Sequence, residues 1–449
     1  TLLAFCLIAS LCVVGAAAVS VEGCPGGDSC AHEAAIGDVH YDTLEEAFSR
    51  AVSGNTVTLL REIANCIAIN IVDGRSITLD MNGFNIRFSS NQRINIIHGE
   101  LNITGSGMLY EEMPYYAPVM MYGSEDNVAN YSVVTIGPDV TLKGWAGLFI
   151  DCHDEHTAQA YGIVANVYGT LESVRDIEGA GGHALYINGQ ITSTDGNVPR
   201  FILDGATLIT EKGNGMYLAG YAETSITDST ITSVGVNSTG IEIRAGKLSI
   251  AGNTVIRASE GKVEVDPNGN GSTSANVALA VAQHTTKLPI EIAVEGGTFI
   301  GGAAFNQSNP QDNAEEFVKQ IHISIQDGVF TGIVNSENFE GFIEGGNFDQ
   351  SVAAYVADGL KYEANSDGVF TYHRTIESAV EAAGSGGSVS MISNGAAVDD
   401  DTGHTITRID GGSKTTMTVT DGYVYTLPEL DKNGYTFVGW RLGNSNTIL

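Results

Sequence analysis

Short apolar stretches that end in Gly, Asn or Asp recur through the middle of the chain. Their spacing is roughly twenty residues with occasional longer gaps, which is typical of a solenoid with one coil per unit and loops inserted on one side. Each stretch is too short to be stable alone, so we expect neighbouring coils to stack around a continuous core. Six apolar residues mark equivalent positions: Leu208, Ile231, Val255, Phe299, Phe330 and Phe348.

Two matching phrases flank these stretches. "TLEEAFSRAVSGNTVTLL" occupies residues 43–60 and "TIESAVEAAGSGGSVSMI" residues 375–392. In the first phrase Thr43 is suited to an N-cap, Gly54 to a helix stop, and the alternation after it to a strand. We therefore predict a short amphipathic helix, a turn and a strand at each place. The apolar residues of the first helix share one face: Leu44, Ala47, Phe48 and Ala51.

Together the stacked stretches and the first phrase resemble the right-handed parallel β-helix of the pectate-lyase-like superfamily, over residues 33–372. In that superfamily such a phrase caps the solenoid, so the resemblance implies that residues 33–60 cover the first coil. Without cover, the first coil exposes its apolar interior to water. The alternative is an array of all-β sandwiches, which the repeated Gly-Gly corners favour less.

The C-terminal run "YTLP" at 425–428 and "GYTFVGW" at 434–440 resembles the start of the Listeria–Bacteroides repeat, a small β-grasp-like module of bacterial surface proteins. This resemblance implies an incomplete repeat over 413–449, after a second cap-like segment and linker over 373–412. The expected fold class is all-β: a right-handed parallel β-helix with a short N-terminal capping helix and a small C-terminal β-rich module. Whether the second phrase closes the same solenoid stays open.

The first eighteen residues form an apolar run that ends in Ala16–Ala18, as in a cleaved signal peptide. A membrane anchor is the alternative, but no basic cluster follows the run. Residues 19–32 form a linker in which Cys24 and Cys30 could close a small disulfide loop, with a zinc site as the weaker interpretation. The pairing of the next two cysteines along the chain stays open.

Charge limits the classes of partner. The 449 residues include 53 acidic and 21 basic side chains, for a net charge of -32. Nucleic acids and anionic membrane surfaces are bound through clustered Lys and Arg, so the balance argues against both. It fits a secreted or cell-surface protein that is not inserted in the membrane after signal cleavage.

Catalytic patterns are incomplete. Hydrolases of polygalacturonase type need Gly-His-Gly and a closely spaced Arg and Lys, whereas this chain has Ala184 after His183; we expect that histidine in a loop or at a coil corner. A loose match to pectate lyases makes Asp151, His153 and Asp154 candidate catalytic or metal-binding residues, against the alternative of a solvated loop.

The sequence requires no cofactor, but it contains a candidate calcium loop. Asp266, Asn268 and Asn270 match the first half of a calcium loop, but the expected bidentate Glu at the end is missing. A Pro-Asn-Gly turn explains the same residues.

An aromatic stretch over 107–131 interrupts the alternation with tyrosines and methionines. Tyrosine offers a ring face for sugars and a hydroxyl for hydrogen bonds, so an exposed set would form a binding platform; a packed set would only cover the solenoid. The candidate ligand-binding residues are Tyr115, Tyr116, Tyr122 and Trp145.

These observations favour a non-catalytic adhesin of a bacterial surface, whose β-helix presents loops to a polysaccharide or to a host surface protein. The first alternative is a calcium-dependent polysaccharide lyase or glycoside hydrolase. The second is a structural spacer within a larger surface protein.

Overall fold

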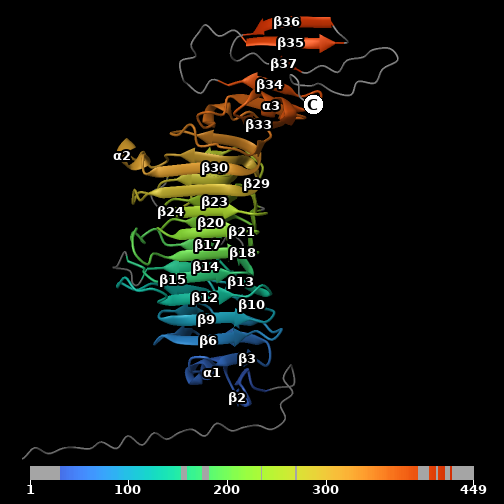
Figure 1. Ribbon diagram of the computed structural model, residues 1–449. Helices are drawn as coiled ribbons and strands as arrows, with labels where there is room; N and C mark the ends of the chain where they lie inside the picture. Colours follow the sequence, from blue (N-terminus) through green and yellow to red (C-terminus); the bar gives the residue numbers. More distant parts are fainter. Residues whose placement is uncertain are drawn as a thin grey trace, which may run out of the picture.

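The computed structural model describes residues 31–152, 159–173, 182–233, 235–267, 271–392, 404–410, 413–419 and 425–426. Strands stack along one long axis, from helix α1 (Leu44–Arg50) at one end to helix α3 (Ile376–Ala383) near the other (Figure 1). Nearly all neighbouring strands of the stack are parallel and hydrogen-bonded. The predicted all-β parallel β-helix is thereby confirmed.

Each coil contributes one strand to each of three faces. The first face holds β3 (Thr56–Leu59), β6 (Arg75–Asp80), β9 (Gly99–Thr104), β12 (Ser132–Ile136), β15 (Ile163–Val167), β18 (Arg200–Asp204), β21 (Glu223–Thr227) and β24 (Gly246–Ala251). The second holds β4 (Ile63–Cys66), β7 (Ile86–Phe88), β10 (Gly107–Tyr110), β13 (Val140–Gly144), β16 (Thr170–Ser173), β19 (Thr207–Thr210), β22 (Thr230–Ser233), β25 (Val255–Arg257) and β31 (Asn347–Phe348). The third holds β5 (Ile69–Ile71), β8 (Ile94–Ile96), β11 (Val119–Tyr122), β14 (Ala146–Asp151), β17 (Gly182–Ile187), β20 (Gly213–Leu218), β23 (Thr239–Ile243) and β28 (Val277–Ala282). Two long strands, β29 (Ile290–Ser308) and β30 (Ile321–Ser336), run across all three faces.

The strand pairing along the second face confirms the predicted equivalent positions, except for one residue. Leu208 pairs with Ile231, and Phe299 with Phe330, which in turn pairs with Phe348. Val255 is the wrong member of the series, because Ile231 pairs with Ile256, and Ile256 is the side chain that is fully buried. Two adjacent branched residues satisfy the pattern equally well, and only the register of the preceding turn decides between them.

The interior is one continuous hydrophobic core that extends from Ala34 to Tyr372. Phe299, Phe330 and Phe348 stack inside it, with ring centroids 4.7 Å and 4.9 Å apart. No disulfide joins the buried Cys66 and Cys152. The stretch 107–131, which we expected to interrupt the stack, instead supplies strands β10 and β11, so only its loops leave the coil.

The first phrase forms the predicted cap. The side chain of Thr43 accepts a hydrogen bond from the backbone N–H of Glu46 (3.2 Å), which satisfies one free donor of the first helical turn. Leu44, Ala47 and Phe48 are buried in the main core, so α1 closes the first coil. Strands β1 (Ala34–Ile36) and β2 (Val39–Tyr41) form an antiparallel hairpin, and β1 also pairs antiparallel with β3.

The second phrase also folds as a helix and a strand, α3 and β34 (Ser388–Met391). The side chain of Thr375 caps α3 through the N–H of Ser378, as Thr43 does in α1. Helix α3 packs on a small antiparallel sheet of β32 (Tyr362–Ser366), β33 (Val369–His373) and β34. Because β33 pairs antiparallel with β31, this unit follows directly on the last coil of the same solenoid.

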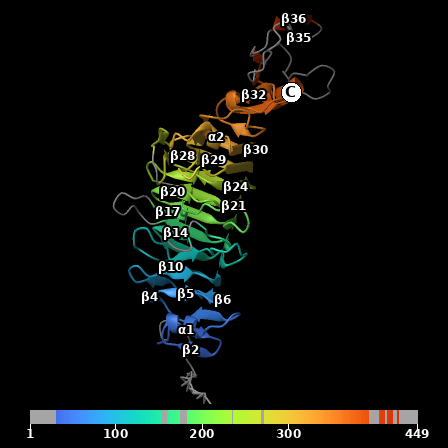
Figure 2. The same ribbon diagram turned by 90° about the vertical axis from the view of Figure 1, so that its left-hand side faces the viewer.

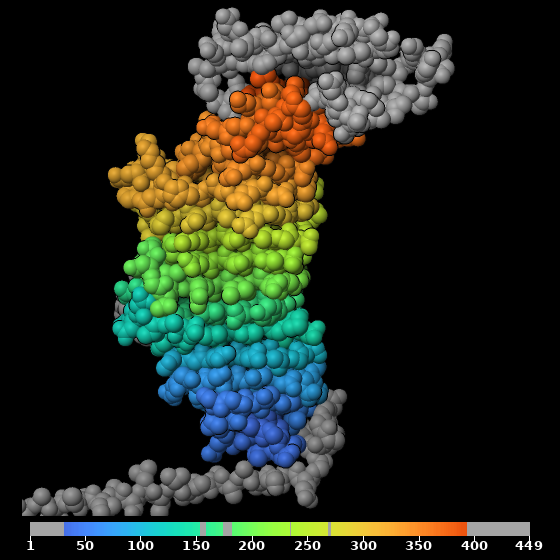
Figure 3. All heavy atoms as spheres, in the orientation of Figure 1, coloured from blue at the N-terminus to red at the C-terminus, as the bar shows by residue number. Residues whose placement is uncertain are grey.

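The remaining elements lie at the margins of the stack. They are the hairpin β26 (Glu264–Val265) and β27 (Ser274–Ala275), helix α2 (Glu315–Val318), a 3-10 turn (Ala353–Tyr355), the hairpin β35 (His404–Asp410) and β36 (Ser413–Val419), and β37 (Tyr425–Thr426). β37 pairs with β34, so part of the predicted C-terminal module (413–449) contacts the unit formed by the second phrase. The described chain is a narrow rod in both the turned ribbon view and the space-filling view (Figures 2 and 3).

Candidate functional site

Aromatic side chains gather on the outer side of the third face, over β11, β14 and β17. Trp145 lies at the centre, with ring centroids 5.3 Å from Tyr115, 5.5 Å from Tyr186 and 6.5 Å from Phe149. Phe149 and Tyr186 meet edge to face at 4.5 Å, because their strands pair in register. We name this group the aromatic patch; it consists of Tyr115, Tyr116, Tyr122, Trp145, Phe149 and Tyr186.

All four aromatic residues singled out in the sequence therefore lie in one patch. Phe149 and Tyr186 were missed, because each is distant in sequence from the tyrosine-rich stretch. A signal for them exists, since the strands "GLFID", "ALYIN", "GMYLA" and "GIEIR" repeat one pattern with Phe149, Tyr186, Tyr217 and Glu242 in the same outward column.

Tyr115 is the most exposed ring of the patch, with 58% of its surface accessible. Its backbone φ is 67°, a left-handed conformation that bulky side chains rarely adopt. Such strain costs about 1 to 2 kcal/mol and persists where the surroundings impose it, often at functional sites. The Tyr115 ring is exposed to solvent and also contacts Trp145 in a tilted arrangement.

Arg93 joins the patch at its lower edge. Its guanidinium lies 4.0 Å from the centroid of the Tyr116 ring, and its Nη1 donates to Sδ of Met120 at 2.9 Å. This cation–π contact holds Tyr116 in place and puts a positive charge beside the aromatic surface.

A polar hollow of about 510 Å³ lies at the corner next to Arg93 and is lined in part by Glu111, Ser89 and Arg87. The carboxylate of Glu111 accepts the backbone N–H groups of Asn91 (3.3 Å) and Met113 (2.8 Å), and Asn91 Oδ1 accepts from Arg93 at 2.8 Å. Burial raises the pKa of the Glu111 carboxyl. A continuous set of contacts therefore connects the hollow to the aromatic patch.

Further along the third face, the outward column of Phe149, Tyr186 and Tyr217 continues with a charged residue that is buried from solvent. Glu242 of β23 and Arg244, which follows the end of that strand, are both 0% exposed, and Nε of Arg244 lies 3.9 Å from Oε1 of Glu242. The Glu242 carboxylate accepts from the N–H (2.9 Å) and hydroxyl (2.8 Å) of Thr273, and Arg244 donates to the Tyr217 hydroxyl at 3.2 Å. A buried pair with this many partners fixes the segment from Gly271 to Ser274 on the third face and leaves no access for substrate.

His183 lies in β17, so the prediction of a loop or corner position is wrong. Its ring stacks on Tyr217 at 4.9 Å and meets Trp145 edge to face at 5.4 Å. Burial lowers the pKa of His183 to about 3, so the imidazole is neutral at physiological pH. Within the described part of the chain, Nδ1 of His183 and Nε1 of Trp145 have no hydrogen-bond partner.

The predicted catalytic and metal residues are only partly within the described ranges. Asp151 ends β14, where its Oδ1 accepts from the N–H of Cys152 (2.9 Å) and from Nδ2 of Asn188 (2.7 Å). Asp266 is exposed in the β26–β27 hairpin, with its N–H donating to the carbonyl of Thr273 at 2.8 Å. Outside the described residues lie His153, Asp154, Asn268, Asn270, Cys24 and Cys30. Among the residues described, no three His, Cys, Asp or Glu side chains are placed to share a metal ion.

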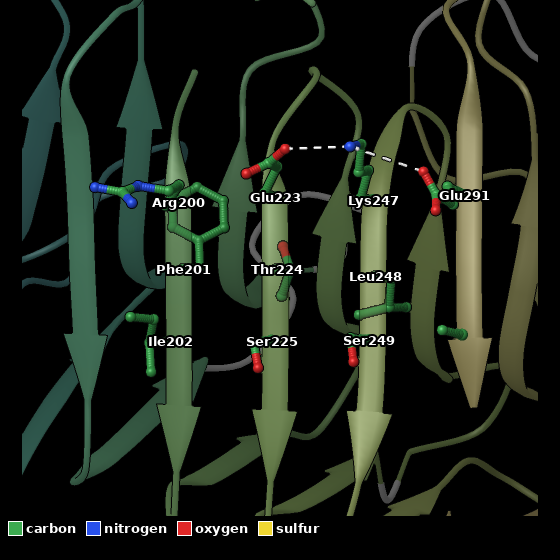
Figure 4. Close-up of a pocket in the computed structure, with 11 residues that line it drawn as sticks. Arg200, Phe201, Ile202, Glu223, Thr224, Ser225, Lys247, Leu248, Ser249 and Glu291 are labelled. Atoms are coloured by element: carbon green, nitrogen blue, oxygen red, sulfur yellow. Dashed lines mark ion pairs between the residues drawn. The ribbon is translucent and has the colours of Figure 1, made fainter. Parts of the chain in front are cut away.

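The first face carries a second, shallower depression of about 330 Å³ over β18, β21, β24 and β29. Figure 4 shows a charged row of side chains and a row of small or aliphatic residues that cross these strands, with the buried Phe201, Thr224 and Leu248 between them. The charged row contains Arg200, Glu223, Lys247 and Glu291; the other contains Ile202, Ser225, Ser249 and Ala293.

Comparison with protein-family models, with curated proteins and with solved structures gives no match. The fold therefore defines the class, a capped parallel β-helix with an aromatic patch on one face. Among the described residues, no helix has the length and apolar character needed to cross a bilayer.

Proposed function

We propose that this chain is a non-catalytic surface protein that binds glycan through the aromatic patch. The observation that carries the proposal is the convergence of six rings from three coils on the outside of a rigid scaffold, with Tyr115 exposed. Aromatic faces pack against the C–H groups of sugar rings, and tyrosine hydroxyls hydrogen-bond to sugar hydroxyls. The export and surface location that the sequence resemblances imply would place such a patch where polysaccharides are met.

The polar surroundings fit a sugar better than a purely apolar ligand. Arg93 and the hollow lined by Glu111 supply donors and acceptors beside the rings, as carbohydrate ligands require for orientation. Asp151, beside the upper edge of the patch, offers a further acceptor. The ligand then stacks on the exposed ring of Tyr115, which the buried Trp145 supports, and reaches the hollow with its hydroxyls.

The lyase or hydrolase alternative has less support. Its candidate residue Asp151 is held by two hydrogen bonds, and the acidic and basic pair further along the same face, Glu242 and Arg244, is sealed from solvent. Catalysis requires carboxylates that reach the scissile bond.

The test is a glycan array followed by calorimetric titration of each glycan that binds. Tyr115→Ala with Tyr116→Ala should weaken binding about 5- to 150-fold, because stacking contributes about 0.5 to 1.5 kcal/mol per ring. Tyr168→Ala is the matched control, since Tyr168 is also exposed but lies outside the patch.

Three results contradict the proposal. Equal affinity of the double variant and the control would show that glycan binds elsewhere. Release of unsaturated products or of reducing ends from acidic or neutral polysaccharides, abolished by Asp151→Asn, would establish the enzyme instead. Absence of any glycan binding would favour the structural spacer.

A further inference from the structure

The charged row on the first face alternates in sign along the solenoid axis. Registered neighbours across four strands are Arg200 with Glu223, Glu223 with Lys247, and Lys247 with Glu291. Nζ of Lys247 lies 3.4 Å from Glu223 and 3.8 Å from Glu291, whereas within the described chain Arg200 forms no ion pair (Figure 4). The row is neutral, which is unusual on a chain of net charge -32.

The adjacent row varies in size rather than in charge. Ile202 is 42% exposed at one end, Ser225 and Ser249 follow, and Ala293 ends the row. The depression exists because three of the side chains are small, and the large Ile202 lies at its border (Figure 4). A methyl-rich side chain is therefore exposed next to a hollow on the same surface.

Both rows become complementary to themselves when a second copy is turned by two-fold symmetry. An axis parallel to the strands and between β21 and β24 reverses the direction of the solenoid and places the two first faces together. Arg200 then lies opposite Glu291 of the other copy, and Glu223 opposite Lys247. In the adjacent row, Ile202 of each copy enters the hollow above Ala293 of the other. Such a closed, isologous arrangement is the commonest form of homodimer.

We propose that the first face is the interface of an antiparallel homodimer of this chain. Every charge in the row gains an opposite partner across the interface, and Arg200 gains its first. A neutral row is also where two strongly acidic copies repel each other least at close range. The occupant is a second copy because the charged row is complementary to itself in charge and the adjacent row is complementary to itself in size.

The area of the first face bears on how stable the proposed dimer is. Strands lie about 4.8 Å apart and rise about 3.3 Å per residue, so β12 to β30 offer roughly 30 Å by 16 Å, or about 500 Å² per copy. A total near 1,000 Å² is at the lower limit for specific interfaces, so we expect a weak dimer. The aromatic patch lies on the third face and stays uncovered on both copies.

Sedimentation equilibrium at about 0.15 M salt, with protein from about 5 to about 300 μM, tests the proposal. The native protein should show a monomer–dimer equilibrium in that range. Lys247→Glu places two carboxylates opposite each other at each of two symmetric positions, and Glu223→Lys does the same with two amines. Each variant alone should be monomeric over the whole range, which is at least a tenfold loss of association.

The decisive experiment mixes the two variants. The carboxylate introduced at position 247 then faces the amine introduced at position 223, and the native pair restores the other contact, so an equimolar mixture should form heterodimers. The double variant Glu223→Lys with Lys247→Glu should dimerise again for the same reason. Lys361→Glu, an equal charge change at an exposed site outside the face, is the matched control and should dimerise normally.

Circular dichroism of each variant separates loss of association from loss of fold. A native protein that is monomeric at every concentration refutes the interface. So do single variants that dimerise like the control, or a mixture of two well-folded variants that stays monomeric.

Discussion

His183 makes the stability of the third face depend on pH. Its pKa falls from the ordinary value of 6.5 to about 3 because the ring is buried among Trp145, Tyr186 and Tyr217. The unfolded chain accepts the proton near pH 6.5, but the folded chain does so only near pH 3. Acidification therefore stabilises the unfolded state, and the contribution of this residue is complete above about pH 6.5 and is lost progressively toward pH 3.

The magnitude follows from the two pKa values. One pKa unit corresponds to about 1.4 kcal/mol, so the full shift corresponds to on the order of 4 to 5 kcal/mol, of which about 2 kcal/mol is lost between pH 7.5 and pH 5. His183→Phe keeps the ring contacts and removes the titrating group together with Nδ1, which has no partner among the described residues. The variant should lose about 2 kcal/mol less than the native protein over that interval.

Urea unfolding at pH 7.5 and pH 5 measures the difference. Trp145 is 5.4 Å from His183, and a Trp440→Phe background makes its fluorescence the only tryptophan signal. His284, whose pKa burial and the charge of Arg244 lower to about 4, titrates in both proteins and cancels in the comparison. His322→Gln, an exposed site on β30, controls for loss of any histidine. Equal losses in the native protein and in His183→Phe would refute the reasoning.

Two further predictions concern the core and the patch. Phe330→Ala should lower the free energy of unfolding by about 3 to 5 kcal/mol, because it opens a cavity between Phe299 and Phe348; a calorimetric loss below 1 kcal/mol would contradict that packing. Tyr115→Asn should be about 0.5 to 1 kcal/mol more stable than Tyr115→Ala, since Asn tolerates the left-handed φ of 67° better. Both variants should bind glycan equally poorly, and urea midpoints that do not differ would show that the backbone there is unstrained.

Sequence reasoning reached the architecture because a solenoid repeats its signal in every coil. Strand length, turn residues and the two capped helices at Thr43 and Thr375 are local properties, and each was readable in place. The register of the strands was harder to predict from the sequence than the strands themselves. At "TVIR" the pattern allows either Val255 or Ile256 to face inward, and only pairing with Ile231 and Phe299 selects Ile256.

Of the candidate site, only the residues that lie close together in the sequence could be predicted. Tyr115, Tyr116 and Tyr122 lie in one stretch and Trp145 follows in the next coil, so their proximity could be anticipated from the sequence. Tyr186 arrives from the coil after β14, and its position depends on how many residues the intervening loop contains. The Glu242–Arg244 pair was unexpected for another reason, because composition alone gives no sign that a carboxylate and a guanidinium can both be fully buried.

The two caps reverse strand direction, and this gives the stack a fixed length. β1 lies antiparallel to β3 at one end, and β33 lies antiparallel to β31 at the other. An exposed parallel edge would template another copy of itself, as in a growing cross-β filament. At each end, a reversed strand next to a capping helix replaces the parallel edge, so a second molecule cannot continue the parallel hydrogen-bonding pattern. The repetition that lets an amyloid fibril grow without limit therefore ends here after a set number of coils.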